Sequence, residues 1–408
     1  CAFSSTAQTI SQTDAEAKAA AFLKHGPLAA TRGAASADKL ELTYKSAKGD
    51  ETYYYIFNER KTGAFVIVAG DERATEILGY GDHGCLDYDK APENFKWWMS
   101  QYELQIHEAI QQNLKPAAKR QPLTRAGSGR VTIPEMIKTQ WDQHMPYNSQ
   151  LPILGPDYTG NKGLATGCVA TAMAQVMNYH KYPTKGTGRN SYTGINDLIF
   201  EADFENTYYD WDNMLDSYND TYTTEQANAV ATLMYHCGVA VNMDYGQIGH
   251  GGSTAYPDEI PIALTTYFGY DKSVQLVERK YYTDDEWTNL IYSELLAGRP
   301  LLYRGVDVYK GGGHRFVCHG YNAEDNTFAI NWGWGGSHDG YFTLMGVDGL
   351  QPKGTGIGGA GEGASYTNYQ DIIINVMPDQ GTLKTPLVMY CYTNNERTVA
   401  FDNSQDKY

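Results

Sequence analysis

The sequence predicts an α+β protein with a small α+β unit followed by a larger domain of two lobes, one helical and one an antiparallel sheet or barrel. Three observations predict this arrangement. Short strand patterns and one long amphipathic helix fill the first quarter of the chain, helical patterns precede strand patterns in the rest, and a basic stretch with Gly and Pro separates the two parts. A chain of 408 residues is also too long for one ordinary domain.

The first unit begins with an alanine-rich helix over residues 13–24, which has its acidic residues first. Strands follow between turns that contain Gly and Lys, and we expect them at Leu40–Tyr44, Glu51–Phe57 and Ala64–Ala69. A long amphipathic helix over Pro92–Leu114 then carries five apolar residues, Phe95, Trp97, Trp98, Tyr102 and Ile106. No set of catalytic residue types stands out here. We assign residues 13–114 to this unit and residues 1–12 to a polar leader.

Residues 115–130 form a linker of different composition. They include five Lys or Arg, two Pro and no acidic residue, in a chain whose formal net charge is −16. Such a stretch is expected to be exposed and open to proteases. A plain tether and a processing site both fit, and the cut would follow one of four basic residues, Lys119, Arg120, Arg125 or Arg130.

The larger domain is expected over residues 131–378. Two capping boxes, Thr223 with Gln226 and Thr283 with Glu286, predict helix starts. Cys237 falls at core spacing in the first of these helices. Strand patterns follow at Leu301–Gly305, His314–Gly320, Thr327–Trp332, Gly340–Leu344 and Asp371–Val376. Residues 379–408 are a polar extension to which we assign no role.

Composition argues against several classes of protein. The acidic balance, with a pI near 5.0, disfavours a nucleic-acid partner. No apolar run reaches the roughly 18 residues that a membrane-spanning helix needs. Six scattered cysteines without a CxxC pair disfavour a zinc ribbon, a thioredoxin-type site and a disulfide framework. The N-terminal residues lack the charged-then-apolar pattern of an export signal, so we expect any signal to have been removed; Cys1 fits a lipid-modified end or an arbitrary boundary.

Cys168 begins a predicted helix directly after a loop of small residues, 163–167. A helix N-terminus offers free N–H donors and partial positive charge, which favour a thiolate, the nucleophilic form of cysteine. Taken alone, Cys168 would count as one more small buried hydrophobe. A role as nucleophile is favoured only if the chain also supplies a base and a donor for the oxyanion.

His314 and Asn331 supply the remaining residue types of a cysteine nucleophile site. His314 follows three glycines at the start of a strand, where the backbone has to clear a substrate. Asn331 is followed by Trp332, so an amide oxygen could orient the imidazole while the indole shields it. Taken alone, His314 would be interpreted as an ordinary strand residue, and the segment after Asn331 as a hairpin corner with buried tryptophans. Together they follow Cys168 by 146 residues and then 17 residues, which is the papain order.

These segments resemble the streptopain family of cysteine proteases, which includes the interpain type. The resemblance rests on residues 166–172, the glycines before His314 and the run Asn331–Gly336, and it extends over residues 13–377. Residues 141–148 match the family segment with the oxyanion-hole glutamine, which maps to Gln143; Gln140 matches less well. Residues 242–246 and a glycine-rich run near 354 also have counterparts in the family. The resemblance as a whole implies substrate contacts at Gly312, Gly313, Met243 and Tyr245.

The resemblance implies a papain-like fold and a secreted zymogen whose first unit is an inhibitory pro-domain. Cys168 would then attack peptide bonds with His314 as general acid and base, Gln143 in the oxyanion hole, and Asn331 and Trp332 as orienting residues. The implied partners are protein or peptide substrates and the chain's own pro-domain, and a dedicated protein inhibitor is a further partner compatible with the resemblance. No cofactor or metal is implied. The implied location is outside the cell or in the cell envelope.

Two other functions remain open from the residues alone. An amidase or transpeptidase that acts on cell-wall peptides would use the same Cys and His, and a non-catalytic relative would only bind peptides. A dinucleotide site is disfavoured because the GxGxxG pattern at 354–359 follows no clear strand and precedes no helix. A metal at His314, Cys318 and His319 is disfavoured because only two of the three side chains share a strand face.

Overall fold

The computed structural model describes residues 8–27, 40–117, 129–154, 163–247, 252–306, 313–347, 369–379, 381, 388–393 and 396–401. Its helices are α1 (Gln12–His25), α3 (Glu93–Gln111), α4 (Cys168–His180), α5 (Thr224–Ala240), α6 (Glu259–Tyr267) and α7 (Asp284–Leu296). Its strands are β1 (Leu40–Lys48), β2 (Glu51–Glu59), β3 (Ala64–Ala69), β4 (Ile77–Gly81), β5 (Arg189–Thr193), β6 (Ile199–Asp203), β7 (Gln275–Glu278), β8 (Leu301–Val306), β9 (Gly313–Asn322), β10 (Thr327–Asn331), β11 (Gly340–Phe342), β12 (Gln370–Ile374), β13 (Val388–Thr393) and β14 (Glu396–Phe401).

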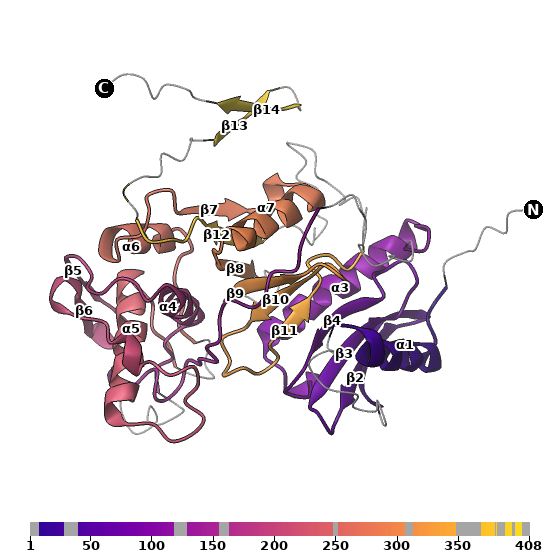
Figure 1. Cartoon of the computed structure of the whole chain (residues 1–408), viewed down its shortest axis with the longest axis horizontal. Helices are drawn as coiled ribbons and strands as arrows, with labels where there is room; N and C mark the ends of the chain where they lie inside the picture. The colour runs from indigo at the N-terminus through magenta and orange to yellow at the C-terminus, as the bar shows by residue number, and fades with distance from the viewer. Residues whose placement is uncertain are drawn as a thin grey trace, which may run out of the picture.

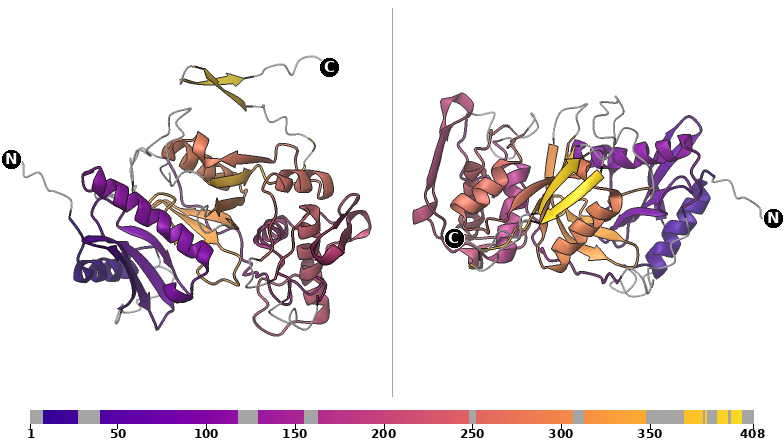
Figure 2. Two further views of the ribbon diagram at one scale, coloured as in Figure 1. Left: turned by 180° about the vertical axis from the view of Figure 1, so that it is seen from behind. Right: turned by 90° about the horizontal axis from the view of Figure 1, so that it is seen from above.

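One antiparallel sheet of ten strands runs through both units of the chain. Its order is β1-β2-β3-β4-β11-β10-β9-β8-β12-β7, so the four strands of the first unit continue into six strands of the second. The junction is the pairing of β4 with β11, where Tyr80 lies opposite Tyr341 and Gly79 opposite Phe342. The expected sheet or barrel is therefore an open sheet. In Figures 1 and 2 its first-unit strands lie at one end of the molecule and the helical lobe at the other, with β8 to β11 between them.

The two faces of the sheet contribute to different cores, because successive side chains on a strand point to opposite faces. In the second unit, Leu302, Val317 and Ile373 pack with α4, α5 and α6 in the helical lobe. Their neighbours Tyr303 and Phe316 pack on the other face, in a core that α3 and α7 cover. In the first unit, α1 covers the face opposite to α3 (Figure 1).

Helix α3 confirms the expected amphipathic helix, but its apolar face serves both units. Trp98 packs edge-on against Trp332, Phe316 and Tyr303, with ring centroids 5.7–5.9 Å apart. Phe95 packs on Trp332 at 5.5 Å. The ring of the half-buried Trp97 lies against the backbone of Gly305 in β8, where a Cβ atom would come within 1.9 Å of it. The helix therefore joins the two units along the sheet.

Both capping boxes are present, at the starts of α5 and α7. All five expected strands of the second unit form, as β8 to β12, and Cys237 lies in the core. Four features were missed: strand β4, strand β7, helix α6 and the β5–β6 hairpin. Strand β4 carries Gly79 and Gly81, which read as turn residues. They are needed because a Cβ at Gly79 would come within 2.6 Å of the Phe342 ring. Helix α6 contains Pro261, which a helix tolerates in its first turn.

The linker prediction falls mostly outside the described residues, since residues 118–128 are not among them. Arg130, at the end of the linker, lies over the rings of Tyr292 and Tyr321, 5.2 and 5.9 Å from their centroids. In the extension, β13 and β14 pair with each other. Among the helices of the described part of the chain, none is long and apolar enough to cross a membrane.

Candidate active site

Cys168 is the first residue of α4, as the sequence predicts. Gly167 precedes it with φ of 89°, a left-handed conformation that favours glycine, and no side chain caps the helix start. The Met243 sulfur and methyl group lie 2.8–2.9 Å from where a Gly167 Cβ would be. No side-chain cap therefore competes for the N–H groups at the start of α4, and Met243 packs directly behind Gly167.

The thiol of Cys168 is half-buried and sits against strand β9. Its Sγ accepts a hydrogen bond from the backbone N–H of Arg315, at 3.4 Å. Burial raises the thiol pKa, while the N–H groups of Arg315, Val169 and Cys168 and the Arg315 charge act against it. The net shift is upward, so the thiol is protonated at neutral pH in this form of the protein. Cys237 and Cys318 are fully buried and Cys85 is exposed.

His314 lies next to Arg315 in β9, so the structure brings Cys168 to the residue adjoining the predicted base. Its Nε2 is 2.8 Å from the carbonyl oxygen of Trp332. Because a carbonyl only accepts, Nε2 carries the proton and Nδ1 is left as the basic nitrogen. The imidazole stacks on Trp334 at 4.6 Å, and burial lowers its pKa to about 4. His314 is therefore a neutral imidazole here.

Asn331 lies at the end of β10 but binds groups other than the imidazole. Its Oδ1 accepts from Gln175 of α4 and from the N–H of Gly333, both at 3.0 Å. Its Nδ2 donates to the carbonyl of Thr139 at 2.7 Å. The side chain thus ties α4 to the loop 332–339. Sequence reasoning missed Gln175, although a glutamine among the apolar residues of a buried helix was a usable signal.

Trp332 contributes its backbone to the site as well as its ring. The carbonyl holds His314, and the N–H donates to Asp339 Oδ1 at 2.8 Å. The buried indole donates to the carbonyl of His338 at 3.0 Å. The sequence predicted shielding by the ring; it contained no signal that the peptide groups on both sides of this residue would be used.

Gln143 lies on a segment that is bonded to both sides of the site. Its carbonyl accepts from Thr166, two residues before Cys168, at 3.2 Å. Two residues before Gln143, the carbonyl of Trp141 accepts a hydrogen bond from the N–H of Gly335, in the loop 332–339, at 3.0 Å. Gln140 instead lies beside Gly336. These contacts tie the backbone of Gln143 to the loop before Cys168, whereas Gln140 lies at the loop 332–339.

The predicted substrate contacts fall in different places. Gly313 is exposed at the start of β9, and Gly312 lies outside the described residues, as does the glycine-rich run near 354. Met243 is buried behind Gly167. Tyr245 is buried in the helical lobe, with its ring 4.7 Å from Phe200 and its hydroxyl on the carbonyl of Tyr235. It therefore belongs to the core that supports the site.

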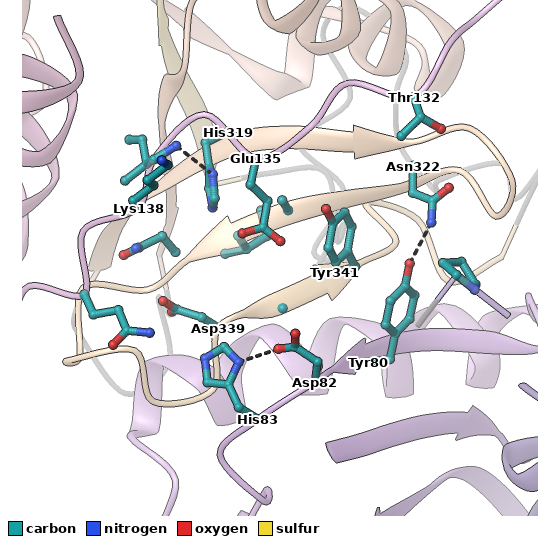
Figure 3. Close-up of a pocket in the computed structure, with 18 of the residues that line it drawn as sticks. Tyr80, Asp82, His83, Thr132, Glu135, Lys138, His319, Asn322, Asp339 and Tyr341 are labelled. Carbon is teal, nitrogen blue, oxygen red and sulfur yellow. Dashed lines mark hydrogen bonds and ion pairs between the residues drawn. The ribbon is translucent and has the colours of Figure 1, made fainter. Parts of the chain in front are cut away.

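A cavity of about 660 Å³ opens where the first unit meets the second (Figure 3). Asp82 and His83 of the first unit face Glu135 and Asp339 of the second across it. Burial raises the pKa of Asp339 to about 7. The bond from Asp82 raises the pKa of His83. The cavity is connected to the site because Asp339 holds the Trp332 peptide.

Comparison with known proteins finds relatives of both units of the chain. Residues 141–342 match the model of the Peptidase C10 family, and residues 7–106 match that of the Spi protease inhibitor. Streptopain of Streptococcus pyogenes is 34% identical over 394 residues, which cover 91% of this chain and 93% of that protein. The thiol protease/hemagglutinin PrtT of Porphyromonas gingivalis is 32% identical over 352 residues, which cover 83% of this chain and 39% of PrtT.

Two solved structures of Prevotella intermedia proteins are also similar. A prointerpain A fragment matches with a TM-score of 0.68 and 35% identity, covering 84% of this chain and all of the fragment. Active interpain A matches with a TM-score of 0.51 and 40% identity, covering 60% of this chain and 95% of that one. The longer match includes the first unit, which is hereafter the pro-domain; the second unit is the catalytic domain. The chain belongs to the Peptidase C10 family of cysteine peptidases and carries an inhibitor-like pro-domain of its own.

Proposed function

We propose that this chain is the latent precursor of an endopeptidase in which Cys168 is the nucleophile, His314 the general acid and base, and Gln143 an oxyanion donor. The observation that carries the proposal is the contact of Sγ with the N–H of Arg315, the residue next to His314. The bond from His314 Nε2 to Trp332 leaves Nδ1 as the nitrogen that can take the thiol proton.

The reaction is an acyl transfer. His314 takes the thiol proton, and the thiolate adds to the peptide carbonyl carbon. The Gln143 side chain and the N–H of Cys168 stabilise the oxyanion, each such donor contributing about 3 kcal/mol to lowering the barrier. His314 then protonates the leaving amine as the C–N bond breaks. A water that gives its proton to His314 attacks the thioester, which releases the acid and the thiol.

Latency follows from the charge state of the two reacting groups. Burial keeps the thiol protonated and the imidazole neutral, so the reactive ion pair is absent from this form. Much of the cover over the Trp332 side of the site comes from α3, through Phe95 and Trp98. We propose that removal of the pro-domain lets water and substrate reach the site, which lowers the thiol pKa and raises that of His314.

The activating cut is proposed to fall in the linker 115–131, before Arg130. The guanidinium of Arg130 is held by two tyrosine rings and by Asn326 Oδ1, at 3.3 Å. A protease needs an extended, free segment of several residues around the bond it cuts, and this anchored end of the linker is less suitable. Lys119, Arg120 and Arg125 are better candidates.

Intact mass over time tests the proposal. The chain and its Cys168→Ala variant are each incubated alone under reducing conditions. Loss of a fragment that ends between residues 115 and 131, in the parent chain only, is expected for self-processing. The activated chain should then digest casein and leave muropeptides intact. Equal clipping of both chains, together with failure of an irreversible thiol-protease inhibitor to label Cys168, would contradict the proposal.

We further propose that the protein acts after export from the cell. A peptidase made with its own inhibitor-like domain is harmless until it is cut, which suits an enzyme that has to leave the cell before it works. Fractionation of the producing cells checks this: the precursor or its product should appear in the medium or the cell envelope, and retention in the cytoplasm would argue against it.

A further inference from the structure

Four charged residues form a row across neighbouring strands of the sheet. Arg315 of β9 lies opposite Arg304 of β8, and Arg304 lies opposite Asp371 of β12. Glu278 of β7 continues the row opposite Asp371. The row therefore begins with two positive side chains near the middle of the sheet and ends with two negative ones at its edge.

All four side chains lie on the face that α4 covers. The residue two positions away on each strand packs into the core of the helical lobe, and these residues are Val317, Leu302, Ile373 and Leu276. Residues two apart on a strand share a face. Cys168 begins the helix on that same face, so the positive end of the row lies under the nucleophile.

Arg315 is the buried end of the row. Its Nη2 lies 2.8 Å from Asp371 Oδ1, with no exposure of the Arg315 side chain, and its Nη1 donates to the carbonyl of Leu302 at 3.1 Å. Asp371 is shared with Arg304, whose Nε lies 2.5 Å from the other oxygen. Within the described structure, Arg315 Nε has no hydrogen-bond partner. One carboxylate thus serves two guanidinium groups, and a buried cation that is only partly neutralised favours a further anion nearby.

The thiol is the group in position to become that anion. Its Sγ accepts from the Arg315 N–H, and the Arg315 charge favours its ionised form. The first turn of α4 has no acidic side chain. On the neighbouring segment, Asp142 and His144 pair with each other at 2.8 Å. At the far end of the row, Glu278 pairs with Lys280 at 2.6 Å.

We propose that Arg315 is a positioning residue for the nucleophile: its N–H fixes Sγ, and its buried positive charge, held by Asp371, supports the thiolate. The inference rests on the proposed role of Cys168. It gives the thiolate a source of stabilisation that does not depend on a proton on His314. It also assigns opposite effects to the two ends of the row, since loss of a positive charge should disfavour the thiolate and loss of the Asp371 charge should favour it.

The test measures thiolate formation at Cys168 as the rate of alkylation by iodoacetamide, from about pH 5 to about pH 11, with the modified peptide read by mass spectrometry. The full-length chain carries His314→Ala, which removes the imidazole and blocks self-processing. Arg315→Met, Arg315→Lys, Arg304→Gln and Asp371→Asn are then added singly. Exposed Cys85 is the internal control in every sample.

Arg315→Met is expected to raise the alkylation midpoint of Cys168 by about one pH unit, the lower end of the effect of a close opposite charge. Arg315→Lys should keep most of the parent midpoint. Arg304→Gln should raise it less, Asp371→Asn should lower it, and Cys85 should not move. If Arg315→Met does not fold, the opposite shifts of Arg304→Gln and Asp371→Asn carry the test.

Equal midpoints in all variants, or a shift of Asp371→Asn in the same direction as Arg304→Gln, would overturn the inference. Failure of the proposed function looks different. In that case the His314→Ala chain would still process itself, or Cys168 would resist alkylation up to the highest pH while Cys85 reacts.

Discussion

Backbone groups hold the atoms that we propose to react. Sγ of Cys168 meets the N–H of Arg315, and His314 meets the carbonyl of Trp332, whose own N–H is held by Asp339. Cys168, His314 and Asn331 could be picked out because acyl transfer needs a nucleophile, a base and an orienting group, and because these three follow the chain order of papain. Their partners could not, because a peptide group has no signature in the sequence. Asn331 shows the difference: it was expected to orient the imidazole, and its amide binds α4 instead.

Substitution of Asn331 is therefore expected to act on stability. Asn331→Ala removes three buried hydrogen bonds and should cost about 3 kcal/mol of unfolding free energy. The acidic and basic limbs of the pH profile of kcat/KM should stay at the same pH values, because the Trp332 carbonyl still holds His314. Urea unfolding in a Cys168→Ala background and a pH–rate profile of the active chain check the two halves.

Gln175→Ala is the matched control for Asn331→Ala. It removes the hydrogen bond to Asn331 and a second one, which Gln175 Oε1 accepts from Thr139 Oγ1 at 2.8 Å, without touching the loop 332–339. Because two bonds are lost and not three, a smaller loss of stability and an unchanged pH profile are expected. A displaced limb of the pH profile in Asn331→Ala, with no loss of stability, would show that the amide orients the imidazole after all.

At the level of elements, α3 is the part of the pro-domain that packs over the Trp332 side of the candidate site. Its periodicity predicted an amphipathic helix, and the helix is there. A single helix pattern cannot say which protein surface will bury its apolar face, so its packing on Trp332 and Gly305 was not predictable. The same limit applies to β4, whose pairing with β11 joins segments more than 250 residues apart. Local signals such as the capping boxes were reliable because both partners lie within one helical turn.

Trp97→Ala is expected to weaken latency. The ring packs on Gly305, opposite His314 in the β8–β9 register, and loss of a half-buried indole costs about 2 kcal/mol of packing. The lag before self-processing should shorten several-fold. The mature enzyme is identical in both cases, because Trp97 is removed with the pro-domain, so its kcat/KM should not change.

Lys96→Ala provides a control for Trp97→Ala on the same helix. Lys96 bonds Glu93 within α3 and the carbonyl of Asp89, at 3.0 and 3.1 Å, so the lag should stay close to that of the parent chain. Equal lags for Trp97→Ala and the parent would mean that α3 does not hold the site closed.

Across the whole molecule, the interface cavity links pro-domain docking to pH. Asp339 has its pKa raised from 3.8 to about 7, so its contribution to stability is fully present below pH 3.8 and is lost as the pH rises to about 7. His83 also has a raised pKa, so its contribution is lost as the pH rises through that higher value. Burial raises the pKa of Glu135, in the same direction. Burial lowers the pKa of His319, another lining residue, to about 3, so its contribution has the opposite sign and is lost as the pH falls below its ordinary pKa of 6.5.

Docking should therefore weaken as the pH rises from about 4 to about 7, the range over which Asp339 titrates. The measurement is a urea titration of the Cys168→Ala chain at several pH values, with limited proteolysis of the pro-domain as the readout. The urea concentration at the midpoint should fall as the pH rises. Asp339→Asn should flatten the dependence, since its amide oxygen still accepts the Trp332 N–H. Glu201→Gln, on the distant β5–β6 hairpin, is the control and should leave the slope unchanged. A midpoint that rises with pH would contradict the assignment.

The shared sheet means that cutting the chain and freeing the enzyme are separate events. The pairing of β4 with β11 and the packing of α3 on its aromatic core are non-covalent, so they persist after the linker is cut. A nicked molecule is then a complex of two chains, and its dissociation constant decides how much free enzyme is present. Activity should then lag behind the cut and appear faster when the nicked sample is diluted. A dilution series of freshly nicked protein measures it, and activity that tracks the cut at every concentration would show that the pro-domain leaves at once.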